Sequence, residues 1–326
     1  MTIRQILVSP AYQAGSEVTG TLVVGADRPT PVDSLVLAAR DADDQQFDFP
    51  SLDNALVTDR TEHSAVRQLP PGRYRLFGSY LLDGAWTELP SCELVVDAAP
   101  AGRQVVFDAP FSDRQAWAVG RTSAYPANGR NPADGKLDQL GPGFAPTPDG
   151  TFRARRAGAL WHTDLVSTEF APGGFELLPG DEVTATCTLN ATRGSWPAIW
   201  TWGRDQAQGS PQPGHGEVDL FEYHDTNPRL LELTNHLRPT VKYADDLITP
   251  GVPFQLRVTL GEGDVRWYVD GNLVFADGAG VGPDWRAWLI VNISVAAGTY
   301  GHLPPGPQLS ELDWNCADLK VWRATG

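Results

Sequence analysis

The chain of 326 residues contains little cysteine, little methionine and little positive charge. Its cysteines, Cys92, Cys187 and Cys316, are far apart, which excludes a disulfide framework and a paired C-x-x-C metal site. Lysine and arginine together number 25 against 40 acidic residues, so the formal net charge is −15. Because nucleic acids and anionic membrane surfaces bind positive patches, this balance argues against both and favours a neutral partner.

Long apolar runs are also missing. The longest apolar-rich stretch, Ala287–Ala297, contains Asn292 and Ser294, so we expect no membrane span. The opening segment MTIRQILVSP does not have the pattern of a signal peptide. The motifs of zinc metalloproteases, P-loop proteins, Rossmann folds and α/β-hydrolases are absent as well, which leaves those chemistries without support.

Glycine and proline, in contrast, are abundant, with 33 and 27 residues, which is too many for a helical bundle. Short apolar segments separated by turn residues occupy the first hundred positions. The strands that this pattern predicts are Ile3–Ser9, Val18–Val24, Ser34–Ala39, Arg73–Leu82 and Cys92–Val96. Their spacing is typical of an immunoglobulin-like or fibronectin-like β-sandwich, and we predict such an accessory module for residues 1–100.

A second all-β domain is predicted for residues 101–326. The segment Asp97–Arg103 is small, contains proline and has few apolar residues, which is typical of a linker. After it, short strands continue without a long segment of helical periodicity. Of 11 tryptophans, only Trp86 precedes residue 101. Tryptophan rings stack on the apolar faces of sugars, although core packing is the commoner role of any single tryptophan.

Three carboxylates lie close together in the sequence, at Glu217, Asp219 and Glu222. On an extended strand Glu217 and Asp219 share one face, because side chains alternate with a period of two. Glu222 follows Asp219 at an odd offset and would enter the apolar side of a regular strand, at a cost of several kcal/mol. A β-bulge at Leu220–Phe221 would return it to the face of the other two.

Carboxylates that lie close together do not all ionise easily, so at least one pKa is expected to rise. A retaining glycosidase uses this arrangement, with an ionised nucleophile and a protonated acid about 5–5.5 Å apart. The same residues also fit a solvated acidic edge strand or a calcium site built from carboxylates. The segment alone does not decide among these three interpretations.

Glu217–Glu222 resembles the E-x-D-x-x-E signature of glycoside hydrolase family 16 in its bulged, laminarinase-like form. Four more segments resemble motifs of that family in the same order: Gly194–Trp200 the G-x-W-P-A-x-W strand, Trp267–Gly271 the W-Y-V-D-G hairpin, Leu289–Asn292 the L-x-x-N strand and Ala317–Val321 the closing strand. The resemblance extends over about residues 104–324.

This resemblance implies a concanavalin-like β-jelly-roll with an open cleft, in which a β-linked polysaccharide, by default a β-1,3-glucan, is cleaved internally with retention. It implies Glu217 as nucleophile, Asp219 as its assistant and Glu222 as acid/base. The substrate-binding residues that it implies are Trp196, Trp200, Trp202, His236 and Asn292. No redox or organic cofactor is needed, and a structural calcium is implied at the position matching Asp318.

Two departures from the family pattern put the substrate in question. Gly180–Thr186 lacks the usual glutamate and arginine, and Ala296–Ala297 replaces a glycine pair; both are expected near the cleft. Alternatives are therefore a depolymerase of galactan or of another cell-surface glycan, associated with a phage, and a non-catalytic glycan-binding protein. The substrate class places the protein outside the cell or on a cell or virion surface. We expect a monomer unless the N-terminal module docks to a larger assembly.

Overall fold

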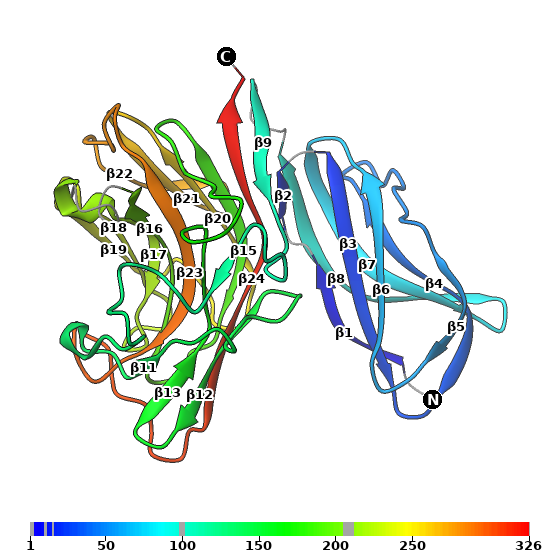
Figure 1. The fold of residues 1–326 in the computed structure, drawn as a ribbon. Coiled ribbons are helices and arrows are strands. Elements are labelled where there is room, and N and C mark those ends of the chain that lie inside the picture. The colour runs from blue at the N-terminus through cyan, green and yellow to red at the C-terminus, as the bar shows by residue number, and fades with distance from the viewer. Residues whose placement is uncertain (1–2, 10–11, 15, 98–101, 205–211, 326) are drawn as a thin grey trace. The chain divides into compact units, whose positions relative to one another are not determined.

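The computed structural model describes all residues except 1–2, 10–11, 15, 98–101, 205–211 and 326. The chain divides into two compact units, Met1–Arg103 and Gln104–Gly326. Strands dominate both units (Figure 1). Of the predicted linker, residues 98–101 lie outside the described residues. Within the described part of the chain, no helix has the length and apolar character needed to cross a membrane.

The first unit consists of two sheets. One has the order β1 (Ile3–Ser9), β3 (Glu17–Ala26), β6 (Thr61–Gln68); the other has the order β2 (Tyr12–Ala14), β8 (Ala85–Asp97), β7 (Gly72–Leu82), β4 (Thr30–Arg40), β5 (Leu52–Val57). A core that includes Leu22, Leu37 and Leu76, all fully buried, lies between them. The two sheets and their shared core confirm the predicted sandwich, while its immunoglobulin-like or fibronectin-like type stays a prediction.

All five strands that the sequence predicts in this unit are confirmed. The sequence did not reveal β2, β5 and β6. The pattern of β6 explains its omission, because it has no fully buried residue and therefore no apolar alternation to detect.

The second unit contains two larger sheets (Figure 1). The seven-stranded sheet has the order β10 (Ala118–Val119), β14 (Leu165–Ser167), β23 (Ala287–Val295), β16 (Ser195–Gly203), β17 (Val218–Tyr223), β18 (Leu231–Asn235), β19 (Thr240–Ala244). The nine-stranded sheet has the order β11 (Asp138–Gln139), β13 (Leu160–Thr163), β12 (Thr151–Ala157), β24 (Glu311–Ala324), β15 (Glu182–Leu189), β20 (Phe254–Leu260), β21 (Val265–Val269), β22 (Asn272–Ala276), and β9 (Arg103–Asp108) pairs with β24. The all-β prediction is confirmed.

One hydrophobic core lies between these two sheets, and the residues that enter it define the inner side of each strand. Ile199 of β16, Leu233 of β18 and Val291 of β23 are fully buried members of this core. Since side chains alternate along a strand, the residues next to them point to the opposite side of the seven-stranded sheet. We call that side the outer face of this sheet; it carries the candidate active site.

Candidate active site

The strand β17 carries the bulge that the sequence predicts. Adjacent residues of β16 pair with Phe221 and with Asp219, which leaves Leu220 as an extra residue. The pairing of β17 with β18 shifts register between Asp219 and Glu222 as well. Leu220 and Phe221 are both fully buried in the core, so the carboxylate of Glu222 returns to the outer face beside Asp219.

All three carboxylates have a raised pKa. For Glu217, burial is the first cause and the negative charge of Asp219 the second, and the pKa lies well above its usual value. Burial also comes first for Asp219, followed by the charge of Glu222. For Glu222, burial raises the pKa most, the charge of Glu232 raises it further, and Lys136 opposes them. The expected rise is confirmed, but desolvation contributes more than the repulsion between neighbouring charges from which the rise was predicted.

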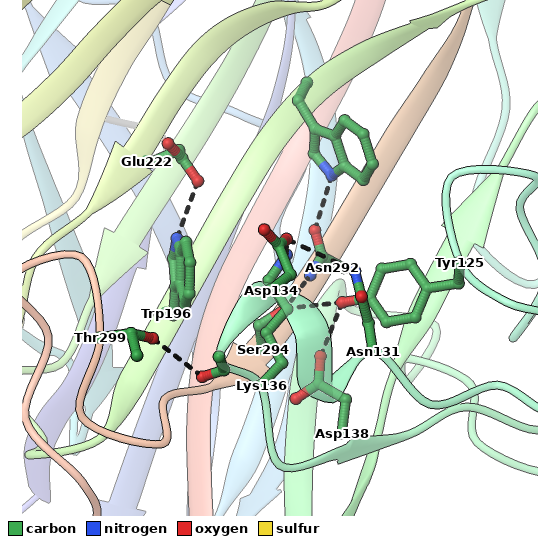
Figure 2. Close-up of polar contacts among 12 residues, drawn as sticks. Tyr125, Asn131, Asp134, Lys136, Asp138, Trp196, Glu222, Asn292, Ser294 and Thr299 are labelled. Carbon is green, nitrogen blue, oxygen red and sulfur yellow. Dashed lines mark hydrogen bonds and ion pairs between the residues drawn. The ribbon is translucent and has the colours of Figure 1, made fainter. Parts of the chain in front are cut away.

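Glu222 accepts a hydrogen bond from the indole of Trp196, whose Nε1 lies 2.8 Å from Oε1 (Figure 2). The ammonium of Lys136 lies 4.6 Å from the centroid of the same indole ring. Lys136 follows the short 3-10 helix η1 (Pro132–Asp134), and its Nζ pairs with Asp134 at 3.3 Å. A cation held over the ring that donates to Glu222 stabilises the ionised form of that carboxylate.

Lys136 was not among the predicted site residues. Its side chain is only 11% exposed. Burial alone would lower its pKa, but the acidic groups around it, Asp138 and Glu222 among them, raise it above its usual range. The lysine therefore stays charged. A lone lysine in a loop carries no local sequence signal that points to a carboxylate more than eighty residues away.

A chain of hydrogen bonds crosses the outer face next to Lys136 (Figure 2). The hydroxyl of Tyr125 lies 2.7 Å from Asp138 and 3.1 Å from Ser294. Asn292 donates to Ser294 at 2.9 Å and accepts from the indole N–H of Trp200 at 2.8 Å. Asn292, a predicted substrate ligand, is buried and bonded within the protein, so in this arrangement it holds Trp200.

Asp219 is fixed from two sides. Its carboxylate lies 2.8 Å from Nε2 of His236, and the side chain of His236 is 44% exposed. From the nine-stranded sheet, the indole N–H of Trp267 reaches the backbone oxygen of Asp219 at 3.1 Å. His236 and Asp219, together with Glu217, have potential ligand atoms within 4.8 Å of one another, a grouping that could also hold a metal ion.

The three predicted tryptophans are an even number of residues apart on β16 and so share one face of the strand, but their surroundings differ. The ring of Trp196 is buried and stacks on His302, with centroids 4.0 Å apart. Trp200 is also buried, in a small cluster on the outer face. Trp202 is the most exposed of the three and stacks on His215, with centroids 5.0 Å apart. Its edges are therefore the most accessible to a ligand.

A second group behind Glu222 was also not predicted. Glu232 lies 2.5 Å from Nε2 of His224, and His224 stacks on His302 with centroids 4.3 Å apart. Burial lowers the pKa of His302 to about 3, so this ring is neutral. Glu232 and Thr234 lie on one face of β18, and His236, directly after the strand, continues that alternation. That alternation is the sequence signal that could have identified it.

Asp318 lies apart from these residues, on β24 of the nine-stranded sheet. It lines a hollow together with Asp108 and Asp149, and Lys320 pairs with Asp108 at 3.4 Å. Within the described residues, the grouping at Asp219 is the one in which three potential ligand side chains lie close enough for a metal. The side chains around Asp318 do not form such a grouping, and calcium binding there stays a prediction.

The two departures from the family pattern lie in different places. The expectation that Gly180–Thr186 borders the carboxylates is wrong, because β15 belongs to the nine-stranded sheet, on the other side of the core from β17. Ala296–Ala297 directly follows β23 of the seven-stranded sheet, and Ala296 forms an isolated antiparallel β-bridge with Lys136. Only this second departure lies beside the site.

Known proteins of similar sequence or structure identify the fold of this chain. No protein-family model matches the chain. Over 156 residues it is 31% identical to a beta-glucanase from Rhodothermus marinus, a match that covers 41% of this chain and 54% of the relative. The match thus spans about half the length of that curated relative.

Solved structures with a similar fold include laminarinases. One is the catalytic domain of an endo-1,3-beta-glucanase (laminarinase) from Thermotoga petrophila RKU-1, with a TM-score of 0.56 and 19% identity, covering 69% of this chain and 99% of that one. Another is the laminarinase from Flavobacterium sp. UMI-01, with a TM-score of 0.54 and 17% identity, covering 68% and 100%. The chain therefore contains the β-jelly-roll fold of these domains, as the sequence predicts.

Proposed function

We propose that the second unit is an endo-acting retaining glycoside hydrolase that cleaves a β-linked polysaccharide, with a β-1,3-glucan as the first candidate substrate. The observation that carries the proposal is the bulged strand β17, which brings Asp219 and Glu222 to one face beside Glu217, the residue directly before the strand. The likeness to a beta-glucanase and to laminarinase folds supports the same class. A polysaccharide substrate places the activity outside the cell or on a cell or virion surface.

In the proposed mechanism, the Glu217 carboxylate attacks the anomeric carbon while Glu222 protonates the leaving oxygen. The glycosidic bond breaks and an ester to Glu217 forms. Glu222, now ionised, takes a proton from water, which attacks the same carbon and frees Glu217. Two attacks on opposite faces restore the original configuration.

The surroundings of Glu222 and Asp219 suit these roles, and the charges of His236 and Lys136 oppose the rise that burial causes in the pKa of Glu217, which has to be ionised to attack. The raised pKa of Glu222 keeps a proton available for the first step. The Trp196 N–H and the Lys136 charge both lower that pKa, so they stabilise the anion that Glu222 becomes before the second step. Asp219, held by His236, lies beside Glu217 and orients it.

The test is release of reducing ends from β-1,3-glucan, mixed-linkage glucan, agarose, carrageenan and arabinogalactan. We expect the wild type to cleave one of these polymers and Glu217→Gln to lose that activity. Glu62→Gln, an exposed glutamate on β6 of the first unit, is the matched control and should keep full activity. Nuclear magnetic resonance of the first product should show the β-anomer.

Other outcomes would contradict the proposal in specific ways. Full activity of Glu217→Gln would show that the role assigned to this residue is wrong. An initial α-anomer would exclude retention. Cleavage of agarose or arabinogalactan alone would replace glucan by galactan as the substrate. Binding of a glycan without cleavage of any polymer would favour the non-catalytic alternative.

A further inference from the structure

The first unit has a hollow on the outer side of its five-stranded sheet. In β4, Leu35 and Leu37 are fully buried in the core between the sheets. Their neighbours Ser34, Val36 and Ala38 therefore point to the opposite side. These small side chains leave room above the sheet.

The hollow has a volume of about 460 Å³. That lies within the range of about 300–1,000 Å³ that is typical of sites for small molecules or for a few sugar units. The residues that line it include Ser34, Ala38, Ser79, Gln46, Trp86 and Glu88. The lining is therefore a mixture of apolar carbon, hydroxyls, an amide and charged groups.

Trp86 is the aromatic side chain that a ligand in this hollow could contact most directly. It follows the turn of the β7–β8 hairpin, where it pairs with Leu81. Trp86 is 55% exposed, and it is the one tryptophan of the first hundred residues. A large ring left in water beside a hollow loses the free energy of burial until a ligand covers it.

The charged residues that line this hollow are paired. Arg40 pairs with Asp48 at 2.6 Å, and Arg75 pairs with Glu88 at 3.1 Å. Both guanidinium groups also lie over the ring of Phe77, 5.3 and 4.2 Å from its centroid. The charged residues that line the hollow are thus all in ion pairs. Asp53, which accepts hydrogen bonds from Ser34 and Ser51 at its edge, adds a negative charge, so the site disfavours anions and suits a neutral ligand.

We propose that this hollow is a second glycan-binding site, which holds a neutral polysaccharide chain by stacking one sugar ring on Trp86. Sugars match the lining because their C–H faces are apolar while their edges carry hydroxyls that bond to groups such as the Gln46 amide. The ion pairs around the hollow discriminate against sulfated and uronic acid polymers. The site lies in the unit that does not carry the three carboxylates.

The experiment measures binding of the full chain to laminarin, mixed-linkage glucan, galactan and glycogen, with alginate and carrageenan as charged probes. All variants carry Glu217→Gln, so that cleavage does not interfere. We expect Trp86→Ala to weaken binding of one neutral polymer about tenfold, Gln46→Ala about threefold, and Trp86→Phe less than Trp86→Ala. Val66→Ala, an exposed side chain on β6 in the other sheet, is the matched control.

A folding control and a stoichiometry separate this site from the carboxylates. Because Trp86 is exposed, its replacement should leave the melting temperature unchanged. For a polymer that occupies both sites, the number of binding sites per chain should fall from about two to one in Trp86→Ala.

The proposal is overturned if neutral polymers bind Trp86→Ala and its parent equally, if none binds the parent, or if only alginate or carrageenan binds. With Glu217 intact, Trp86→Ala should cleave a short soluble oligosaccharide at the wild-type rate. Loss of polymer binding in Trp86→Ala from a protein that cleaves nothing would uphold this site while refuting the proposed hydrolase.

Discussion

The indole N–H of Trp196 lies 2.8 Å from Oε1 of Glu222, and this hydrogen bond lowers the pKa of the carboxyl group. Burial acts more strongly in the opposite direction, so the net pKa remains raised. The candidate acid/base therefore has to meet two opposite requirements. It must hold a proton before the glycosidic bond breaks and must tolerate a negative charge afterwards.

Replacement of Trp196 by phenylalanine keeps an aromatic ring but removes the donor. Because the lost hydrogen bond stabilised the anion, the pKa of Glu222 should rise, and the alkaline limb of kcat/KM should move to higher pH. We expect kcat/KM to fall about tenfold or more, since hydrogen bonds to charged groups contribute about 1.5–3 kcal/mol. Initial rates across the pH range measure both effects. An alkaline limb that stays in place would contradict the role of Trp196.

Lys136→Met should move the same limb in the same direction, because the lysine charge lowers the pKa of Glu222. Lys136→Arg keeps the charge and should retain the wild-type limb even if its rate is lower. Lys242→Met, which replaces an exposed lysine on β19, serves as the control. Equal profiles for Lys136→Met and Lys136→Arg would show that the charge has no part in tuning Glu222.

His236→Ala should act on the opposite limb. His236 lowers the pKa of Glu217, so its removal should raise that pKa and move the acid limb of kcat/KM to higher pH. The activity profile then becomes narrower, and kcat/KM at low pH falls. His63→Ala, on β6 of the first unit, is the matched control. A shift confined to the alkaline limb would mean that His236 acts on a group other than Glu217.

Glu217→Gln should stabilise the fold at neutral pH while it abolishes activity. The pKa of Glu217 is raised in the folded protein, so the folded state prefers the protonated carboxyl. Its contribution is fully present below the unfolded pKa of about 4.3 and is lost as pH rises through the folded pKa. Glutamine avoids that loss. A tenfold difference in proton affinity between the folded and unfolded states corresponds to about 1.4 kcal/mol.

Thermal unfolding of wild type and Glu217→Gln at several pH values tests this expectation. The two melting temperatures should agree near pH 4, and the variant should melt at a higher temperature near pH 8. A difference that is the same at every pH would indicate a packing effect without linkage to ionisation.

Calcium at Asp318 is a separate prediction. If Asp318 is a ligand, added Ca²⁺ raises the melting temperature of the wild type by mass action, and Asp318→Asn loses that response. Glu217→Gln should keep the response, which separates a site at Asp318 from the grouping of Glu217, Asp219 and His236. An unchanged melting temperature of the wild type over a Ca²⁺ titration would refute the prediction.

The sequence alone predicted those features of the site that depend on neighbouring residues. Alternation with a period of two, broken once by an odd offset, predicts the bulge on β17, and the bulge is present. The hairpin at Trp267–Gly271 also forms, as β21 and β22 around a turn. These features depend on neighbours in the chain, because the face that a side chain takes is set by its offset along the strand.

Tertiary structure decided which distant residues meet these carboxylates. Lys136 lowers the pKa of Glu222 from a loop before β11, and Trp267 reaches Asp219 through the core from the other sheet. The order of strands in the two sheets also placed Gly180–Thr186 away from the site. Local patterns state which face is apolar but leave open which strand lies next to which. That order follows from the packing of both sheets around one core.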